Sequence, residues 1–475
     1  MNPVFVAGII GGYFMLLIGI SWLTAGQGDA KTFFTANRQS PWYLVAFGMV
    51  GATLSGVTFI SVPGWVGATQ FTYMQMVMGY MAGYFFIAAV LMPLYYRLNL
   101  ISIYQYLDQR FGPKAYKTGA FFFLLSRTIG AAFRLFLVAG VLQLAFFDHY
   151  GIPFWVSVLV TILLIWVYTF RGGIKTIVWT DTLQTLFMLT AVGVSIVIIT
   201  NDLGLSLSRL NEVIGSSNYG RMFVWDWHSR QNFFKQFFSG AFIAIVMTGL
   251  DQDMMQKNLT CKSIGDAQKN MLWFSVTLLV VKFVFLTLGA LLFIYAAQKG
   301  IALPERMDDL FPMLALNHLG TFAGITFLLG ITAAAYSSAD SALTALTTSF
   351  CVDFLGFKED QDNKATRTKV HLGFSGLLFI VIIIFRLISD DSVISAVFTA
   401  AGYTYGPLLG LYAFGLFTPW QVKDRWVPYI AVASPVVAYI ISSNSVAWFN
   451  GYTMGFEVVI LNGLLAFIGL VMIRK

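Results

Sequence analysis

Thirteen apolar stretches, each close to the length that crosses a lipid bilayer, divide this sequence. Inside a bilayer a chain segment must satisfy its own backbone hydrogen bonds, so an apolar stretch of about 20 residues crosses as a helix. The stretches lie at residues 5–23, 42–68, 72–96, 118–146, 153–170, 176–200, 234–256, 271–298, 320–352, 370–388, 393–417, 427–443 and 452–473. The chain is therefore predicted to be an all-α integral membrane protein with about 13 transmembrane helices.

The composition supports a membrane protein and gives no sign of a separate soluble domain. Hydrophobic residues make up 58% of the 475 residues and charged residues only 11%, and the mean hydropathy is +0.75. A soluble protein of this length needs far more polar surface. The longest extramembrane piece, about 201–233, suggests a short amphipathic outer helix and a loop that could cap an outer vestibule. Residues 1–475 are thus predicted to form a single polytopic membrane domain.

The lysines and arginines predict the orientation of the chain in the membrane. With the N-terminus outside, 19 of the 29 Lys and Arg residues fall in cytoplasmic segments, against seven on the opposite side. The first stretch has no basic n-region and no small-residue cleavage pattern, so it is expected to stay as a helix. We therefore expect a multi-pass protein of the plasma membrane, or of the inner membrane if bacterial, with the C-terminus in the cytoplasm. The net charge of +7 reflects this orientation, and no basic helical motif indicates nucleic-acid binding.

The ninth stretch, residues 320–352, carries a polar face. Its oxygen-bearing side chains recur at positions i, i+3, i+4 and i+7, in Ser337, Asp340, Ser341 and Thr344. A carboxylate at membrane depth costs roughly 2.5–3.5 kcal/mol, so such residues usually face a cavity on an ion or solute path. The spacing indicates a cation site.

The order of the stretches fits an inverted repeat. Residues 42–200 form the first predicted repeat and residues 234–417 the second, and each contains five stretches. An odd number of crossings gives the two halves opposite topology. Residues 5–23 would be an extra N-terminal helix, and residues 427–473 would form two C-terminal helices. In inverted-repeat transporters the first helix of a half is often broken near the bilayer midplane, beside the binding site. The Gly-rich segment FGMVGATLSGVTFISVPG, residues 47–64, stands where such a break is expected.

Four sequence elements together carry a family resemblance that covers nearly the whole chain. They are RGGIKTIVWTDTLQ (171–184), SSADSALTAL (337–346), GATLSGVTFISVPG (51–64) and QKNLTCKSIGDAQK (256–269). These elements resemble the sodium/solute symporter family, whose members carry proline, sugars, sialic acid, iodide and monocarboxylates. The resemblance implies the leucine-transporter-type 5+5 inverted repeat and Na⁺-coupled import of a small organic solute by alternating access.

The resemblance also implies where the sodium ion binds. In the family the ion is held by two backbone carbonyls of the broken first core helix and by one carbonyl and two hydroxyls of the eighth core helix. The corresponding residues of this chain are Gly51, Leu54, Ala334, Ser337 and Ser338. Neutral oxygens suit Na⁺, a hard cation that must be released inside. The alternative is that the two serines only allow close helix packing.

Some family members hold a second Na⁺ next to the first. The corresponding residues here are Asp181, Ser337, Asp340 and Ser341. This chain differs from the members that have a hydroxyl at position 340. The two carboxylates could hold Na⁺, share a proton or pair with a cationic group, so the ion count stays open between one and two.

The solute site is predicted by analogy between the broken helix and its neighbours. Candidate lining residues are Thr53, Ser55, Thr58, Tyr73, Gln75, Met247, Thr399 and Tyr403. The T-x-S-x-x-T pattern of Thr53, Ser55 and Thr58 is similar to that of sialic-acid members, which bind a carboxylate through an arginine of the third core helix. Arg127 and Arg134 are the candidates, and each could instead pair with a membrane carboxylate or reach an interface. Lys282 is expected to pair with a carboxylate across the bundle.

Other functions were weighed against the same sequence. The four histidines lie in loops or at span ends without an HExxH or CxxC pattern, so the protein is not expected to be an enzyme. A proton-coupled carrier of the same fold, a sugar- or halide-specific member, and a sensor that binds but transports poorly remain alternatives. The expected partners are Na⁺, a small solute such as sialic acid, an amino acid or a monocarboxylate, and the lipid bilayer; the oligomeric state is open.

Overall fold

The computed structural model describes the backbone of residues 3–24, 40–98, 100, 102–169, 174–357, 364–388 and 392–475. Within these ranges the side chains of residues 3–4, 20–24, 167–169, 174–181, 207, 335–338, 340, 364 and 388 lie outside the description. The described residues form helices joined by turns, with two isolated bridges, Ser40 to Cys261 and Val422 to Arg474, and no strand among them. The all-α prediction is confirmed for this part of the chain.

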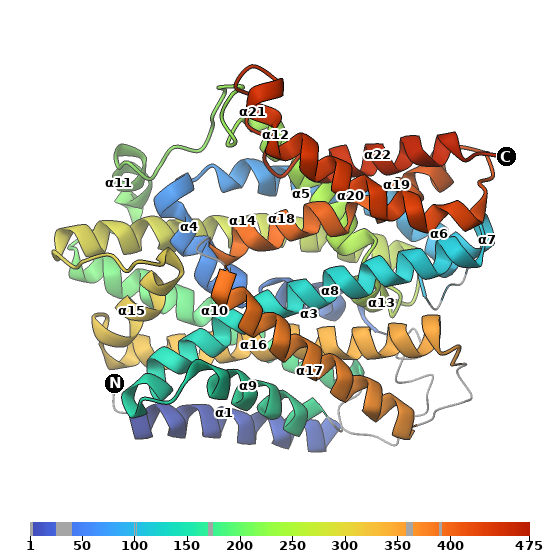
Figure 1. The fold of residues 1–475 in the computed structure, drawn as a ribbon. Coiled ribbons are helices and arrows are strands. Elements are labelled where there is room, and N and C mark those ends of the chain that lie inside the picture. The colour runs from blue at the N-terminus through green and yellow to red at the C-terminus, as the bar shows by residue number, and fades with distance from the viewer. Residues whose placement is uncertain are drawn as a thin grey trace.

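The helices follow one another closely along the chain (Figure 1). Up to residue 202 they are α1 (Pro3–Thr24), α3 (Trp42–Thr53), η2 (Val57–Ser61), α4 (Val62–Thr69), α5 (Tyr73–Phe86), η3 (Ile87–Leu91), α6 (Met92–Leu98), α7 (Gln105–Arg110), α8 (Pro113–Leu142), η4 (Gln143–Phe147), η5 (Asp148–Tyr150), α9 (Phe154–Thr169) and α10 (Ile174–Asp202). Beyond it they are η6 (Leu207–Arg209), α11 (Leu210–Ser216), α12 (Phe233–Ala244), η7 (Ile245–Gly249), α13 (Gln252–Asn258), α14 (Ile264–Gln298), η8 (Met307–Asp309), α15 (Leu310–Asn317), α16 (Gly320–Ser349), η9 (Phe350–Phe354), α17 (Lys364–Ile388), α18 (Val393–Thr404), α19 (Gly406–Phe417), η10 (Asp424–Trp426), α20 (Val427–Ser443), α21 (Ser445–Trp448) and α22 (Val458–Met472).

Each of the thirteen predicted stretches contains a helix. By length and apolar composition, six helices of the described chain can cross a membrane alone, and two bent pairs bring this number to eight. Six shorter apolar helices fall in the remaining stretches. The protein is thus a multi-pass membrane protein, while thirteen crossings stay a prediction. The chain ends near α1 and near α22 lie at opposite ends of the bundle along the helix axes (Figure 1), as an odd number of crossings requires.

Two of these spans are broken, and each is the first of a predicted repeat. The segment Trp42–Thr53 meets Val57–Thr69 at 65°, and Phe233–Gly249 meets Gln252–Asn258 at 73°. At the first break the N–H of Ser55 donates to the carbonyl of Thr53 at 2.9 Å, so the helical ladder stops there. The first break falls in the Gly-rich segment, where it was expected. The second break means that both predicted repeats begin with a broken span.

Glycines let the second helix of one half approach the first helix of the other. A Cβ on Gly79 of α5 would meet the carbonyl oxygen of Phe237, and one on Gly240 of α12 would meet that of Met76. The two backbones therefore lie in direct contact, as small residues allow in membrane helix pairs. This contact brings α5 alongside the second broken span, and α10 packs in the same way along α16.

The piece between α10 and α12 folds back onto α5. It contains the short helix α11, as predicted, and its later part is held by Gln75. The N–H of Val224 donates to Gln75 Oε1 at 3.1 Å, and Gln75 Nε2 donates to the carbonyl of Gln231 at 2.9 Å. These bonds hold the loop against the N-terminal end of α5.

Candidate solute and sodium sites

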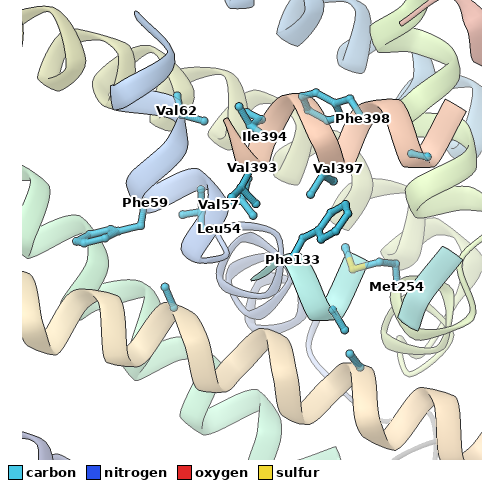
Figure 2. Packing of buried hydrophobic residues seen from close by; sticks show 14 of the residues in the cluster. Leu54, Val57, Phe59, Val62, Phe133, Met254, Val393, Ile394, Val397 and Phe398 are labelled. Carbon is cyan, nitrogen blue, oxygen red and sulfur yellow. The ribbon is translucent and has the colours of Figure 1, made fainter. Parts of the chain in front are cut away.

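A cavity of about 100 Å³ lies at the two helix breaks. Its wall comes from the first broken span, α5, α8, the second broken span, α14 and α18. The lining residues are Ala52, Thr53, Ser55, Val57, Thr58, Tyr73, Tyr80, Tyr84, Arg127, Arg134, Ile243, Ala244, Met247, Thr248, Met254, Leu278, Lys282, Ile394, Val397 and Phe398. Figure 2 shows side chains of α18 facing Leu54 and Val57, with Phe133 of α8 beside them. The structure thus brings both halves of the chain together around one polar-lined space.

Most of the predicted solute-site residues line this cavity. They are Thr53, Ser55, Thr58, Tyr73, Arg127, Arg134 and Met247. The hydroxyl of Thr53 is buried without a hydrogen-bond partner. Because a buried polar group without a partner is costly, this hydroxyl is available to a ligand.

The structure does not place Gln75, Thr399 or Tyr403 against the cavity. Gln75 is one of the residues that hold the outer loop, as described above. The residues of α18 that line the cavity are Ile394, Val397 and Phe398. The other two residues of α18 therefore point elsewhere: Thr399 is exposed and the ring of Tyr403 packs against that of Tyr439. Thr399 and Tyr403 therefore stay predictions of the family analogy that this cavity does not include.

Aromatic rings close the α4 side of the cavity. Trp65 of α4 packs on Tyr73 with ring centroids 5.5 Å apart and on Phe456 at 6.0 Å, and Phe398 contacts all three rings. The hydroxyls of Tyr73 and Tyr80 share a hydrogen bond of 3.1 Å below this cluster. A solute that arrives from the α4 side must therefore displace these rings.

Arg127 is neutralised by two carboxylates that the sequence interpretation missed. Its Nη2 donates to Asp253 Oδ2 at 2.6 Å, and its Nη1 lies 3.5 Å from Asp251 Oδ2. Tyr405 Oη also donates to Asp251 Oδ2, at 3.1 Å. Both acids lie inside the predicted span 234–256, so the cost of a membrane carboxylate could have identified them from sequence. Arg127 thus pairs with membrane carboxylates, which was the alternative to a solute-binding role, although its side chain also lines the cavity.

Arg134 and Lys282 reach the cavity without such neutralisation. In the part of the chain that the structure describes, neither makes an ion pair, and no lining residue is acidic. Lys282 is only 4% exposed. Its Nζ donates to Thr58 Oγ1 at 2.7 Å and lies 5.7 Å from the centre of the Tyr73 ring. The carboxylate partner expected for Lys282 is therefore not found among the described residues.

The predicted first sodium site would lie between the break after α3 and α16. The N–H of Ser55, the helical partner of the Gly51 carbonyl, instead bonds Thr53, which leaves the Gly51 oxygen free of its usual donor. Gly330 of α16 packs on Phe59, and Ile331 packs on Gly56. Ala334 is buried one turn further along α16. The side chains of Ser337 and Ser338 lie outside the described residues.

The second predicted cation site contains an amino group of the protein. Ser341 is buried on α16, and its Oγ accepts a hydrogen bond from Lys257 Nζ at 3.2 Å. Lys257 lies just outside the predicted stretch 234–256, whereas α13 continues through Asn258 and buries it. The side chains of Asp181 and Asp340 lie outside the described residues.

The bundle has a cavity at the breaks of two spans, and cationic side chains line it. This arrangement is typical of an ion-coupled secondary transporter. Residues 33–421 match the model of the Sodium:solute symporter family, and the chain belongs to this family. A sodium/sialic acid symporter of Aliivibrio fischeri is 25% identical over 484 residues, covering 95% of this chain and 90% of that protein. The human sodium/iodide cotransporter is 24% identical over 408 residues, and the match covers 83% of this chain and 62% of the cotransporter.

A solved structure supports the fold. The substrate-bound outward-open state of a Na⁺-coupled sialic acid symporter matches with a TM-score of 0.82 at 19% identity, covering 99% of this chain and 98% of the other. The leucine-transporter-type fold expected from the resemblance is thereby confirmed. These relatives are transporters rather than enzymes, and Na⁺ is the coupling ion of the family.

Proposed function

We propose that the protein imports an organic anion with a carboxylate group together with Na⁺, by alternating access. The observation that carries this proposal is the pair of cations, Arg134 and Lys282, that face the cavity without an ion pair in the described chain. The charges of Asp251 and Asp253 also act on Arg134, but both carboxylates are engaged by Arg127. A buried charge without a partner is strongly unfavourable. An anionic solute would supply the missing charge, and the fork of an arginine matches a carboxylate in two hydrogen bonds.

The polar residues around these cations fit such a ligand. Thr58 already accepts from Lys282, and the unpartnered hydroxyl of Thr53 and the hydroxyl of Ser55 lie on the same segment. The relatives named above carry sialic acid and iodide, which are both anions. This agreement supports an anion over a neutral sugar, and the threonine and serine hydroxyls favour a solute with several oxygen atoms.

Sodium coupling follows from the arrangement of the first broken span. Its carbonyls at Gly51 and Leu54 would hold Na⁺ with Ala334, Ser337 and Ser338 of α16. Its side chains at residues 53, 55 and 58 would hold the solute. Each ligand helps to order the segment that the other needs, so binding of one favours binding of the other. In the orientation predicted by the Lys and Arg residues, with the N-terminus outside the plasma or bacterial inner membrane, both would move inward.

Uptake into proteoliposomes tests this proposal. We expect labelled sialic acid or another carboxylate to accumulate when an inward Na⁺ gradient is imposed, and replacement of Na⁺ by choline at constant pH to abolish the accumulation. Other carboxylates should compete, and neutral sugars should not. Accumulation that persists in choline and follows an imposed pH gradient would instead establish the proton-coupled alternative. Transport of a neutral sugar without competition by carboxylates would contradict the assignment of the solute.

The serines of α16 give a prediction for the first sodium site. Ser337→Ala or Ser338→Ala removes one of about five oxygen ligands, and a hydrogen-bonding contact to a charge contributes about 1.5–3 kcal/mol. The Na⁺ concentration for half-maximal uptake should therefore rise about tenfold or more at similar expression. Thr326→Ala is the control, because the Thr326 hydroxyl bonds only carbonyls of its own helix. Unchanged Na⁺ dependence in both serine variants would rule the site out.

A further inference from the structure

The amino group of Lys257 is buried, although the segment that follows it along the chain is exposed. Its side chain extends from α13 to α16, where Nζ donates to Ser341 Oγ at 3.2 Å, and the residue is 9% exposed. Lys262 and Lys269, in the segment that follows, are both exposed. A lysine stem is long and flexible enough to reach an interface. The cost of burying this charge is offset by the carboxylate of Asp253, one turn earlier on α13, and by the hydroxyl of Ser341 on α16.

The ammonium of Lys257 contacts one residue of the predicted second cation site. Ser341 is one of the residues assigned to that site by the family resemblance, and it stands one helical turn after Ser337 and directly after Asp340. The backbone of α16 is a continuous helix over these positions. The ammonium thus lies against the polar face of α16 on which the sequence places a carboxylate and three hydroxyls.

The surrounding contacts hold the lysine in this position. Helix α13 is capped at its start, where Asp251 Oδ1 accepts from the N–H of Met254 at 3.2 Å. It is fixed to α8 by the 2.6 Å bond between Asp253 and Arg127. At its end Asn258 Oδ1 accepts from Asn270 Nδ2 at 2.6 Å, which ties it to α14. The base of the Lys257 side chain is therefore part of a rigid element between α8, α14 and α16.

We infer that Lys257 provides a tethered cation in place of a second Na⁺, so that the protein couples one Na⁺ to each solute. This inference rests on the proposed Na⁺-coupled function and specifies its ion count. A mobile Na⁺ on the same oxygen atoms would lie next to the ammonium, and like charges repel strongly where water is scarce. The lysine supplies the positive charge that the polar face of α16 needs without a second ion from solution.

The ion count has a consequence for the driving force. One Na⁺ moving with one monovalent carboxylate transfers no net charge, so the steady-state accumulation of the solute should not depend on the membrane potential. Two Na⁺ ions would make the same transport electrogenic, because each net charge that crosses 100 mV contributes about 2.3 kcal/mol. Accumulation of a monovalent carboxylate at imposed potentials of different size therefore reports the coupling ratio.

Equilibrium binding of radioactive sodium to the purified full-length protein tests the inference without knowledge of the solute. We expect one Na⁺ per wild-type protein. In Lys257→Met, which keeps the volume of the side chain and removes its charge, we expect either a second bound Na⁺ or a Hill coefficient for Na⁺-dependent uptake that rises from about 1 toward 2. Lys262→Met is the matched control, since it removes an exposed lysine near the same helix, and it should bind one Na⁺.

The outcomes separate this inference from the function on which it rests. Two Na⁺ ions bound to the wild-type protein, or accumulation of a monovalent carboxylate that follows the membrane potential, would overturn the tethered cation and leave sodium coupling intact. A folded Lys257→Met protein with one bound Na⁺ and an unchanged Hill coefficient would overturn it as well. No Na⁺ binding to wild type would overturn both proposals. If Lys257→Met does not fold, the wild-type ion count decides alone.

Discussion

Replacement of Lys282 by Met is expected to weaken solute binding by about 10- to 100-fold while Na⁺ binding stays nearly unchanged. The ammonium is buried against Thr58 in the cavity and finds no carboxylate among the described residues. A charge-assisted hydrogen bond to the solute contributes about 1.5–3 kcal/mol, and its loss gives a change of this size. Arg134→Lys should have a comparable effect, because the charge remains and the two-pronged geometry is lost. Binding is measured by calorimetry with the carboxylate identified in the uptake screen, in saturating Na⁺.

The stability of the solute-free protein separates a binding role from a structural one. A cation held in place for a ligand costs stability in the absence of that ligand, so Lys282→Met should leave the melting temperature unchanged or raise it. Lys235→Met is the matched control. Lys235 is a buried lysine outside the cavity whose ammonium bonds the carbonyl of Thr453 at 3.1 Å and lies 3.6 Å from the centre of the Tyr452 ring. A lower melting temperature for Lys282→Met, together with unaltered solute affinity, would make Lys282 a structural residue.

The second large effect concerns the ion pair of Arg127. We expect Asp253→Asn to destabilise the protein by up to about 3–5 kcal/mol, because it removes the closer of the two carboxylates that compensate Arg127 and leaves only Asp251, 3.5 Å away. The bond that is lost joins Arg127 Nη2 to Asp253 Oδ2 at 2.6 Å and fastens the second half of the broken span to α8. A marked drop in melting temperature, in detergent or in lipid, checks this expectation. Asp226→Asn, at an exposed aspartate of the outer loop, should leave the melting temperature unchanged.

A double variant shows whether the pair acts as a unit. Arg127→Met with Asp253→Asn removes both charges, so its loss of stability should be smaller than the sum of the two single losses. Asp251 remains near the vacated position, 3.5 Å from Arg127 in the wild type, so some destabilisation should persist. Strictly additive losses would show that Arg127 and Asp253 do not stabilise the structure through each other. A single Asp253→Asn variant as stable as wild type would contradict the structural role of Arg127.

The two arginines of α8 show where prediction from sequence reaches its limit. Arg127 and Arg134 are seven residues apart and lie on nearly the same face of one helix, so spacing alone treats them alike. The structure separates them because the break at Gly249–Asp251 turns α13 toward Arg127 and presents Asp251 and Asp253 to it. These acids follow Arg127 by more than a hundred residues, and no local pattern connects them.

The sequence by itself determined the membrane class, the all-helical fold, the break at the Gly-rich segment and the family. These properties follow from local causes: runs of apolar residues, helical periodicity and short motifs. Only the tertiary structure decided which charges are neutralised. It placed Lys257 on Ser341, left Arg134 and Lys282 facing the cavity, and turned Thr399 and Tyr403 of α18 away from it. The physical reason is that the cost of a buried charge depends on partners from other helices, whose rotation and depth are set by packing across the whole bundle.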